Sequence, residues 1–489
     1  MKSYERLCDK VRKISLVNDT ASVLSWDQET YMPTEGLAYR AKQIAWLAGN
    51  SHNLGTCDDF RKALENAENE SLDDTQSANI RETRNQFDRS SRLPQDLVKK
   101  ASESATFAKA AWAEARQESD FSMFAPHLER LLDIARAKAD LWGYEDEPYD
   151  AMVEGYERGT KTKEIANIFD SVTNQLTNTA QAAVDKSASI SSDILEGECP
   201  IEKQQLFNRE IAEDIGFEFN KGRIDTTTHP FCVGLGPCDT RLTTRYLLND
   251  FTSSVFGVLH EAGHGLYEQG LPETHHGLPS GNAVSLGIHE SQSRLWENHI
   301  GRSRPFWTKW LPRAQELFPH LAAIDLDTFL GAVNRAEKSF IRVEADEATY
   351  DLHILLRFEI ERAMMNQEIQ VAEIPDIWNQ KFESLFGTRP PDDANGCLQD
   401  IHWAMGGLGY FATYTLGNFN AAQLYNCAMK DTHISSAFER ADYLPMLEWM
   451  REKIHSKGSV LLPQELMLDA TGEKTNPQHH IDHLNERFV

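Results

Sequence analysis

The chain has 489 residues, enough to bury a large core and, by length alone, to form about two to four domains. Its 49 basic and 75 acidic residues give a net charge of -26, which disfavours nucleic acid and anionic lipid as partners. Seven scattered cysteines without a C-x-x-C pair are typical of reduced thiols in a cytoplasmic protein. The chain also lacks a signal-like apolar start and any apolar run of about 18 residues, so we expect neither secretion nor a membrane span.

Helical patterns rich in Ala, Leu, Glu, Lys and Arg dominate the first part of the chain, from Tyr4 to about Arg136. Pro33 and Gly36 punctuate the first pair of predicted helices. Two more helices are predicted at Thr162–Lys186 and at about Ile201–Ile215.

The segment Gly222–Tyr246 differs in character, because it is rich in Thr, Gly and Pro and poor in helix formers. It predicts one or two short strands. A strand at this place can offer its edge to an extended peptide through backbone pairing. An ordinary surface hairpin is the alternative interpretation.

The next helix contains the pentad His260-Glu261-Ala262-Gly263-His264. Side chains four residues apart lie on one face of a helix, so both imidazoles can converge on one zinc ion. Glu261 points elsewhere and can take a proton from a metal-bound water. The alternative is a pair of buried histidines, each hydrogen-bonded to a neighbour. Apolar residues at helical spacing predict the buried face of this helix: Val255, Val258, Leu259, Ala262 and Leu266.

A polar, glycine-rich loop follows at Leu271–Asn282. No repeat and no flexible linker appears, so we predict a single, mostly helical catalytic domain over residues 1–489. Three further helical stretches are predicted: about Ala283–Ile300, Leu326–Asn366 with a break, and Ile401–Cys427.

A catalytic zinc ion usually has three protein ligands, so a third must come from outside the pentad. Glu290 lies twenty-six positions after His264 (290 − 264), on a predicted helix that could pack against the first. His289 and Glu297 are competing candidates that spacing does not exclude.

Several motifs of the chain, taken in order, resemble the Taq-type thermostable metallocarboxypeptidases. They extend from about residue 20 to about residue 430 and are specific enough that a chance match is negligible. The motifs are LSWDQETYMP at Leu24–Pro33, THPF at Thr228–Phe231, DTRLT at Asp239–Thr243, HEAGH at His260–His264, LGIHESQSRLWEN at Leu286–Asn298, IRVEAD at Ile341–Asp346, QDIHWAMGGLGYF at Gln399–Phe411 and GNFNAAQ at Gly417–Gln423.

By this resemblance Glu290 is the third zinc ligand and Glu261 the general base. The resemblance implies a mainly α, zincin-like fold: one compact, two-lobed helical body with a deep substrate groove and a small β-sheet beside the zinc helix. It also implies a homodimer that binds one zinc ion per chain. The implied activity is release of the C-terminal residue of peptides with broad side-chain specificity and poor cleavage at proline.

Residues beyond the metal ligands have candidate roles in catalysis and binding. His402, Tyr410 and Tyr414 could donate to the oxyanion of the tetrahedral intermediate, although the tyrosines could instead line a core. Arg342 is our first candidate for the substrate carboxylate and Arg241 the second, because the planar guanidinium suits a carboxylate. Generic salt bridges are the alternative for both. Asp346 and Glu297 are candidates for orienting the ligands.

Two other functions remain open from the sequence. A zinc endo-oligopeptidase or dipeptidyl carboxypeptidase would use the same metal site and groove. A catalytically silent peptide-binding protein would have lost a ligand or the base, and none is lost here. Cobalt or manganese also suits two histidines and one carboxylate, so the native metal stays open.

Overall fold

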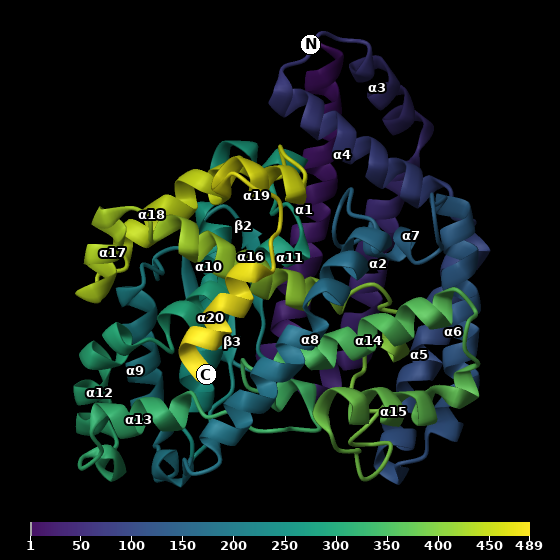
Figure 1. The fold of residues 1–489 in the computed structure, drawn as a ribbon. Helices are drawn as coiled ribbons and strands as arrows, with labels where there is room; N and C mark the ends of the chain where they lie inside the picture. Colours follow the sequence, from purple (N-terminus) through teal and green to yellow (C-terminus); the bar gives the residue numbers. More distant parts are fainter. Residues whose placement is uncertain (1) are drawn as a thin grey trace. The chain divides into compact units, whose positions relative to one another are not determined.

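The structure describes residues 2–489 in a computed structural model, and the chain divides into two units. Unit 1 contains the residues up to Ser91, Ser191–Val333 and Ala421–Lys474. Unit 2 contains Arg92–Ile190, Asn334–Asn420 and Thr475–Val489. The fold is mostly helical with one small sheet, as predicted (Figure 1). The single catalytic domain over residues 1–489 stays a prediction.

Unit 1 holds the sheet and most of the helices. Its helices are α1 (Ser3–Thr30), α2 (Leu37–Thr56), α3 (Asp58–Glu68), α4 (Asp74–Ser91), α9 (Ile201–Asp214), α10 (Thr252–Gly270), α11 (Leu286–Arg294), α12 (Arg304–Leu317), α13 (Leu326–Val333), α17 (Thr432–Glu439), α18 (Leu444–Lys453) and α19 (Pro463–Thr471). Its strands are β1 (Gly222–Thr226), β2 (Cys232–Gly236) and β3 (Asp239–Thr244).

The described residues of unit 2 form helices joined by loops, and no strand is among them. Its helices are α5 (Gln95–Glu118), α6 (Phe121–Trp142), α7 (Asp150–Val153), α8 (Thr162–Ser187), α14 (Tyr350–Met365), α15 (Ile374–Phe386) and α20 (Gln478–Phe488). Helix α16 (Ala412–Ala428) begins in unit 2 and carries the chain into unit 1 at Ala421.

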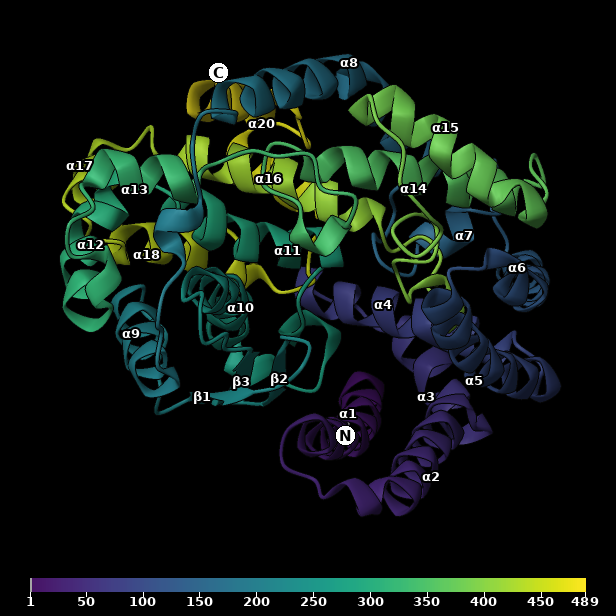
Figure 2. The ribbon, with the colours of Figure 1, turned by 90° about the horizontal axis from the view of Figure 1, so that it is seen from below.

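The sheet has the strand order β1-β3-β2, with β1 parallel and β2 antiparallel to the central β3. Three strands thus form where the sequence predicted one or two. Figure 2 shows them side by side next to α10. Leu242 of β3 is fully buried, and a Cβ at Gly265 of α10 would lie only 2.8 Å from its Cδ2. Gly265 therefore allows the sheet to approach the helix closely.

Most of the predicted helices are present. The stretch predicted at about Ala283–Ile300 is α11 followed by a π-helical turn at Leu295–Ile300. The predicted break within Leu326–Asn366 lies between α13 and α14. The helix predicted from Ile401 begins only at Ala412, because left-handed Gly406 and Gly409 interrupt the backbone before it.

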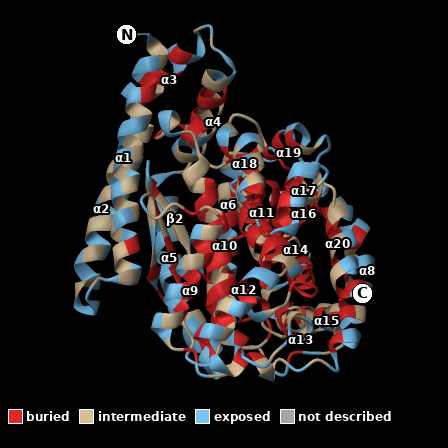
Figure 3. Ribbon diagram, turned by 90° about the vertical axis from the view of Figure 1, so that its left-hand side faces the viewer, coloured by how far each residue is buried: buried red, intermediate tan, exposed pale blue. Residues whose placement is uncertain are grey.

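Burial differs strongly between the helices of unit 1. Figure 3 shows α10 and α11 largely buried, whereas α1 and α2 carry mostly exposed and intermediate residues. Helix α2 has no buried residue at all. None of the helices in residues 2–489 combines the length and the apolar character that a membrane span requires.

Candidate active site

Helix α10 presents the pentad from a buried face. The five apolar residues predicted for this face are all at most 1% exposed, which confirms the helical pattern. The side chains of His260 and His264 retain 21% and 16% exposure. The helix therefore fixes both imidazoles against the core while it leaves their outer atoms accessible.

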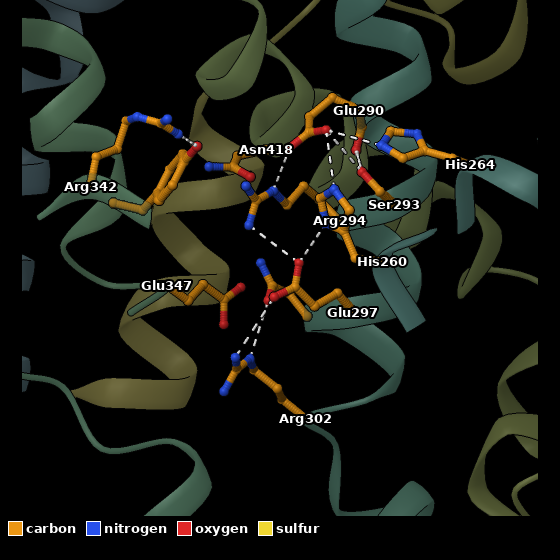
Figure 4. A network of polar contacts seen from close by, with 12 residues as sticks. His260, His264, Glu290, Ser293, Arg294, Glu297, Arg302, Arg342, Glu347 and Asn418 are labelled. Carbon is orange, nitrogen blue, oxygen red and sulfur yellow. Dashed lines mark hydrogen bonds and ion pairs between the residues drawn. The ribbon is translucent and has the colours of Figure 1, made fainter. Parts of the chain in front are cut away.

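His260, His264 and Glu290 converge on one point, with ligand atoms within 4.8 Å of one another. Glu290 Oε2 lies 3.7 Å from His260 Nε2 and 3.5 Å from His264 Nε2 (Figure 4). A tetrahedral zinc ion with bonds of about 2.0–2.2 Å separates its ligands by about 3.3–3.6 Å. The three side chains therefore fit a metal ion without a large change in position.

Glu290 is oriented by its own helix. Its Oε1 accepts a hydrogen bond from Arg294 Nε at 2.7 Å, and its Oε2 accepts one from Ser293 Oγ at 3.1 Å (Figure 4). Burial raises the pKa of Glu290, but Arg294 and the two histidines lower it by more, so the pKa lies well below its usual range. The carboxylate is therefore ionised, as a metal ligand must be.

The other two candidates for the third ligand lie behind the histidines. Glu297 Oε2 is 2.8 Å from His260 Nδ1, and His289 Nδ1 is 2.6 Å from His264 Nδ1. Both contacts use Nδ1 and leave the Nε2 atoms toward Glu290. The geometry therefore favours Glu290 over Glu297 and His289 as the third ligand.

The two histidines differ in their electrostatic surroundings. Burial lowers the pKa of His260, but Glu290 and Glu297 raise it more, to about 9. Burial lowers the pKa of His264 to about 4, and the nearby His289 acts in the same direction. The two pKa values differ in part because His260 Nδ1 contacts a carboxylate, whereas His264 Nδ1 contacts an imidazole.

Glu261 is 6% exposed, and among residues 2–489 its carboxylate accepts no hydrogen bond and forms no ion pair. Burial raises the pKa of Glu261 to about 7; His260 opposes this rise, whereas the charges of Glu290 and Glu297 add to it. A carboxylate with this pKa and without a partner can both accept and release a proton near neutral pH.

Four of the remaining predicted residues form a second cluster, within unit 2. The ring centroids of His402 and Tyr410 are 5.3 Å apart, and those of Tyr410 and Tyr414 are also 5.3 Å apart. The guanidinium carbon of Arg342 lies 5.1 Å from the Tyr414 ring centroid. Arg342 thus lies together with three residues that are 60 or more positions further along the chain.

Arg342 is 5% exposed and has partners inside the protein. Its Nε and Nη2 lie 3.1 Å and 2.8 Å from Asp400 Oδ1, and its Nη1 donates to Tyr350 at 2.9 Å. Arg357 Nη2 lies 2.6 Å from Asp400 Oδ2. Sequence reasoning missed Asp400 and Arg357; the available signal was an acidic residue two positions before His402.

Arg241 lies in unit 1, on β3. Its Nε and Nη2 each lie 2.9 Å from an oxygen of Asp239, and its guanidinium carbon is 4.1 Å from the Trp26 ring centroid of α1. Because neighbouring residues alternate across a strand, Arg241 faces away from the side on which Leu242 contacts α10. Asp346, the other candidate for orienting ligands, instead accepts hydrogen bonds from Thr349 and from backbone amides.

A His-Glu-x-x-His helix beside a small sheet, joined by a carboxylate from a following helix, is the arrangement of a metallopeptidase. The family model described as Carboxypeptidase Taq (M32) metallopeptidase matches residues 6–488. The chain belongs to this family and is a metallocarboxypeptidase.

Individual relatives agree with this assignment. The chain is 38% identical to Thermostable carboxypeptidase 1 of Thermus thermophilus, covering 100% of this chain and 98% of the relative. It is 35% identical to Carboxypeptidase 1 of Bacillus subtilis, covering 99% and 98%. Among solved structures, the M32 carboxypeptidase from Deinococcus radiodurans R1 matches with a TM-score of 0.97 at 34% identity, covering 100% and 99% of the two chains.

Proposed function

We propose that the protein is a zinc-dependent carboxypeptidase that hydrolyses the C-terminal peptide bond of peptides, with broad side-chain specificity and poor cleavage at proline. The observation that carries the proposal is the convergence of His260 and His264 on one oxygen of Glu290, with the unpaired Glu261 on the same helix. The family assignment supports the carboxypeptidase reading over an endo-oligopeptidase or a dipeptidyl carboxypeptidase.

One zinc ion per chain, held by His260, His264 and Glu290, would supply a bound water of lowered pKa and would polarise the scissile carbonyl. Glu261 takes a proton from the attacking water as the new C–O bond forms. It then gives this proton to the leaving amine as the C–N bond breaks, so one carboxylate serves both steps. The products are a free amino acid and a peptide shortened by one residue.

Other side chains bind the oxyanion and the substrate terminus in this proposal. His402, Tyr410 and Tyr414 are the candidate donors to the oxyanion. Arg342 is the first candidate for the substrate carboxylate and Arg241 the second. Both already hold an internal carboxylate, so a substrate would have to share or displace Asp400 or Asp239.

Metal analysis combined with amino-acid release from a short peptide tests the proposal. We expect about one zinc ion per chain, loss of activity with a chelator, and recovery with zinc, cobalt or manganese. A peptide with an amidated C-terminus should be cut far more slowly than the free acid. Equal rates on the two peptides would instead indicate an endo-oligopeptidase.

Glu261→Gln separates the base from the metal site. Its amide cannot take a proton, so kcat should fall by several orders of magnitude while the zinc content stays at the wild-type level. Unchanged turnover would exclude Glu261 as the base.

We also propose a cytoplasmic homodimer. The seven cysteines are free thiols, which suits a reducing compartment. Helix α2 exposes large apolar side chains that a second copy could cover, among them Leu37, Tyr39 and Trp46, at 54%, 70% and 68% exposure. Trp46→Glu should then shift the sedimentation coefficient from dimer to monomer.

A further inference from the structure

A chain of hydrogen bonds extends from His264 to a second carboxylate. His264 Nδ1 is 2.6 Å from His289 Nδ1 on α11, and His289 Nε2 is 2.9 Å from Glu268 Oε1 on α10. Glu268 lies one helical turn after His264, so the chain leaves α10 and returns to it. The side chains of His289 and Glu268 are 19% and 23% exposed, which keeps this hydrogen-bonded chain largely out of solvent.

The protons in this chain have one consistent arrangement, which rests on the proposed role of His264 as a metal ligand. If His264 binds the ion through Nε2, its Nδ1 carries the proton and donates a hydrogen bond to His289 Nδ1. His289 must then carry its own proton on Nε2, which donates to the Glu268 carboxylate. Each group acts as the donor or acceptor that its neighbour requires.

Each of the two proposed metal-ligand histidines would then have a carboxylate that acts on its Nδ1, one directly and the other through His289. His260 Nδ1 contacts the Glu297 carboxylate directly at 2.8 Å, whereas His264 has only an imidazole behind it. We propose that His289 and Glu268 are positioning residues that fix the tautomer and ring orientation of His264 and increase its basicity as a metal ligand. Outer partners of this kind orient ligands and strengthen metal binding.

Gly234 of the edge strand β2 provides the space for the Glu268 carboxylate. A Cβ at Gly234 would lie 2.2 Å from Glu268 Oε2 and 3.0 Å from Glu268 Cδ. Any side chain at this position would therefore push the carboxylate away from His289. Glu268 and Gly234 also line a cavity of about 310 Å³ together with the charged groups of Lys221 and Glu273. The Glu268 carboxylate therefore borders this polar space and also contacts His289.

The experiment measures the affinity of the full-length protein for Zn²⁺ by competition with a chromogenic chelator. It compares wild type with Glu268→Ala, Gly234→Ala and His289→Leu. We expect each variant to bind zinc about 10-fold to 100-fold more weakly, as is typical when an outer partner of a ligand is lost. The visible spectrum of the Co²⁺-loaded protein should change as well, because the orientation of His264 alters the ligand field.

Two further variants make the result specific. His289→Gln can accept from His264 and donate to Glu268, so it should retain more affinity than His289→Leu. Gln269→Ala is the matched control on α10. The substitution removes two 3.0 Å hydrogen bonds to the Glu218 backbone, but Gln269 is not part of the hydrogen bonds that link His264, His289 and Glu268. It should lower thermal stability while the zinc affinity stays unchanged.

Wild-type affinity in both Glu268→Ala and Gly234→Ala would overturn the proposal, and so would an equal loss in Gln269→Ala. Glu268→Ala and Gly234→Ala leave His289 intact, so they decide the question even if His289→Leu does not fold. A wild-type protein that binds no zinc would overturn the proposed function and this inference together. A wild type that binds one ion with variants of equal affinity would overturn only the inference.

Discussion

Arg342 Nη2 lies 2.8 Å from Asp400 Oδ1 in a buried ion pair. Asp400 precedes His402 by two residues, so this pair fixes the start of the loop that carries His402 and Tyr410. Arg357 holds the second oxygen of Asp400 from α14. Burial raises the pKa of Asp400, but Arg357 and Arg342 lower it by more, so the pKa lies well below its usual range. Asp400 is therefore the shared anion of two buried cations.

Asp400→Asn should strongly destabilise the protein. The substitution removes the negative charge but leaves the guanidinium groups of Arg342 and Arg357 buried, at 5% and 1% exposure. Loss of one partner of a buried pair costs about 3–5 kcal/mol. Urea unfolding at neutral pH measures the difference.

An exposed ion pair of the same unit is the control for Asp400→Asn. Arg389 and Glu383 are 2.6 Å apart, with side chains 56% and 50% exposed. Glu383→Gln should change the free energy of unfolding by about 1 kcal/mol or less. Similar effects of the two substitutions would contradict the argument from burial.

Glu361 should hold the other part of the His402 loop. It is fully buried on α14, and it accepts hydrogen bonds from Trp403 Nε1 at 2.8 Å, Gly409 N at 2.9 Å and the Tyr149 hydroxyl at 2.6 Å. Trp403 and Gly409 are adjacent to His402 and Tyr410. In Glu361→Gln an amide group replaces one acceptor oxygen, so the loop should shift and kcat should fall by about 10-fold to 100-fold.

Tyr149→Phe is the matched variant for Glu361→Gln. It removes one hydrogen bond to the same carboxylate, but it keeps both bonds to the loop. The free energy of unfolding should fall by about 1.5–3 kcal/mol with little change in kcat. If Tyr149→Phe lowers kcat as much as Glu361→Gln does, Glu361 acts through general stability and not through the loop.

His402 should make stability depend on pH. Burial lowers the pKa of His402 from 6.5 to about 4; Arg342 and Arg357 act in the same direction, and Asp400 opposes them. Between these two values the folded protein binds fewer protons than the unfolded chain, so its stability rises with pH. The contribution is complete above the unfolded pKa, is lost as the pH falls toward the folded pKa, and amounts to at most about 3 kcal/mol.

The comparison of wild type with His402→Gln isolates this contribution. Unfolding free energies at about pH 7 and about pH 5 should give a smaller pH dependence for His402→Gln than for wild type. Parallel curves for the two proteins would show that His402 does not titrate in this window.

The sequence predicted best what depends on local spacing. His260, His264 and the buried face of α10 follow from positions three and four residues apart, and the structure confirms that helix. The sequence did not reveal α12 and α15, which contain Pro312 and Pro375. Pro375 lies in the first turn of α15, where proline is tolerated.

Contacts between distant residues could not be predicted from spacing. Asp400 and Arg357 are separated by 43 positions, and Glu268 and His289 by 21. Which of these residues meet is determined by how the helices pack. The spacing of residues within a single sequence does not specify that packing. Similarly, Glu290 was chosen over His289 and Glu297 by resemblance, whereas the structure separates them by which nitrogen of each histidine they contact.

Zinc should stabilise the folded chain because the three proposed ligands converge only in the folded state. At a free zinc concentration of about 100 times the dissociation constant, the gain is about 2.7 kcal/mol. Thermal unfolding with a chelator and with buffered zinc measures it as a rise in Tm. Glu290→Gln should abolish the rise, whereas Glu261→Gln should keep it, since Glu261 is proposed as the base and not as a ligand. A rise that survives in Glu290→Gln would place the ion elsewhere, and one that disappears in Glu261→Gln would make Glu261 a ligand.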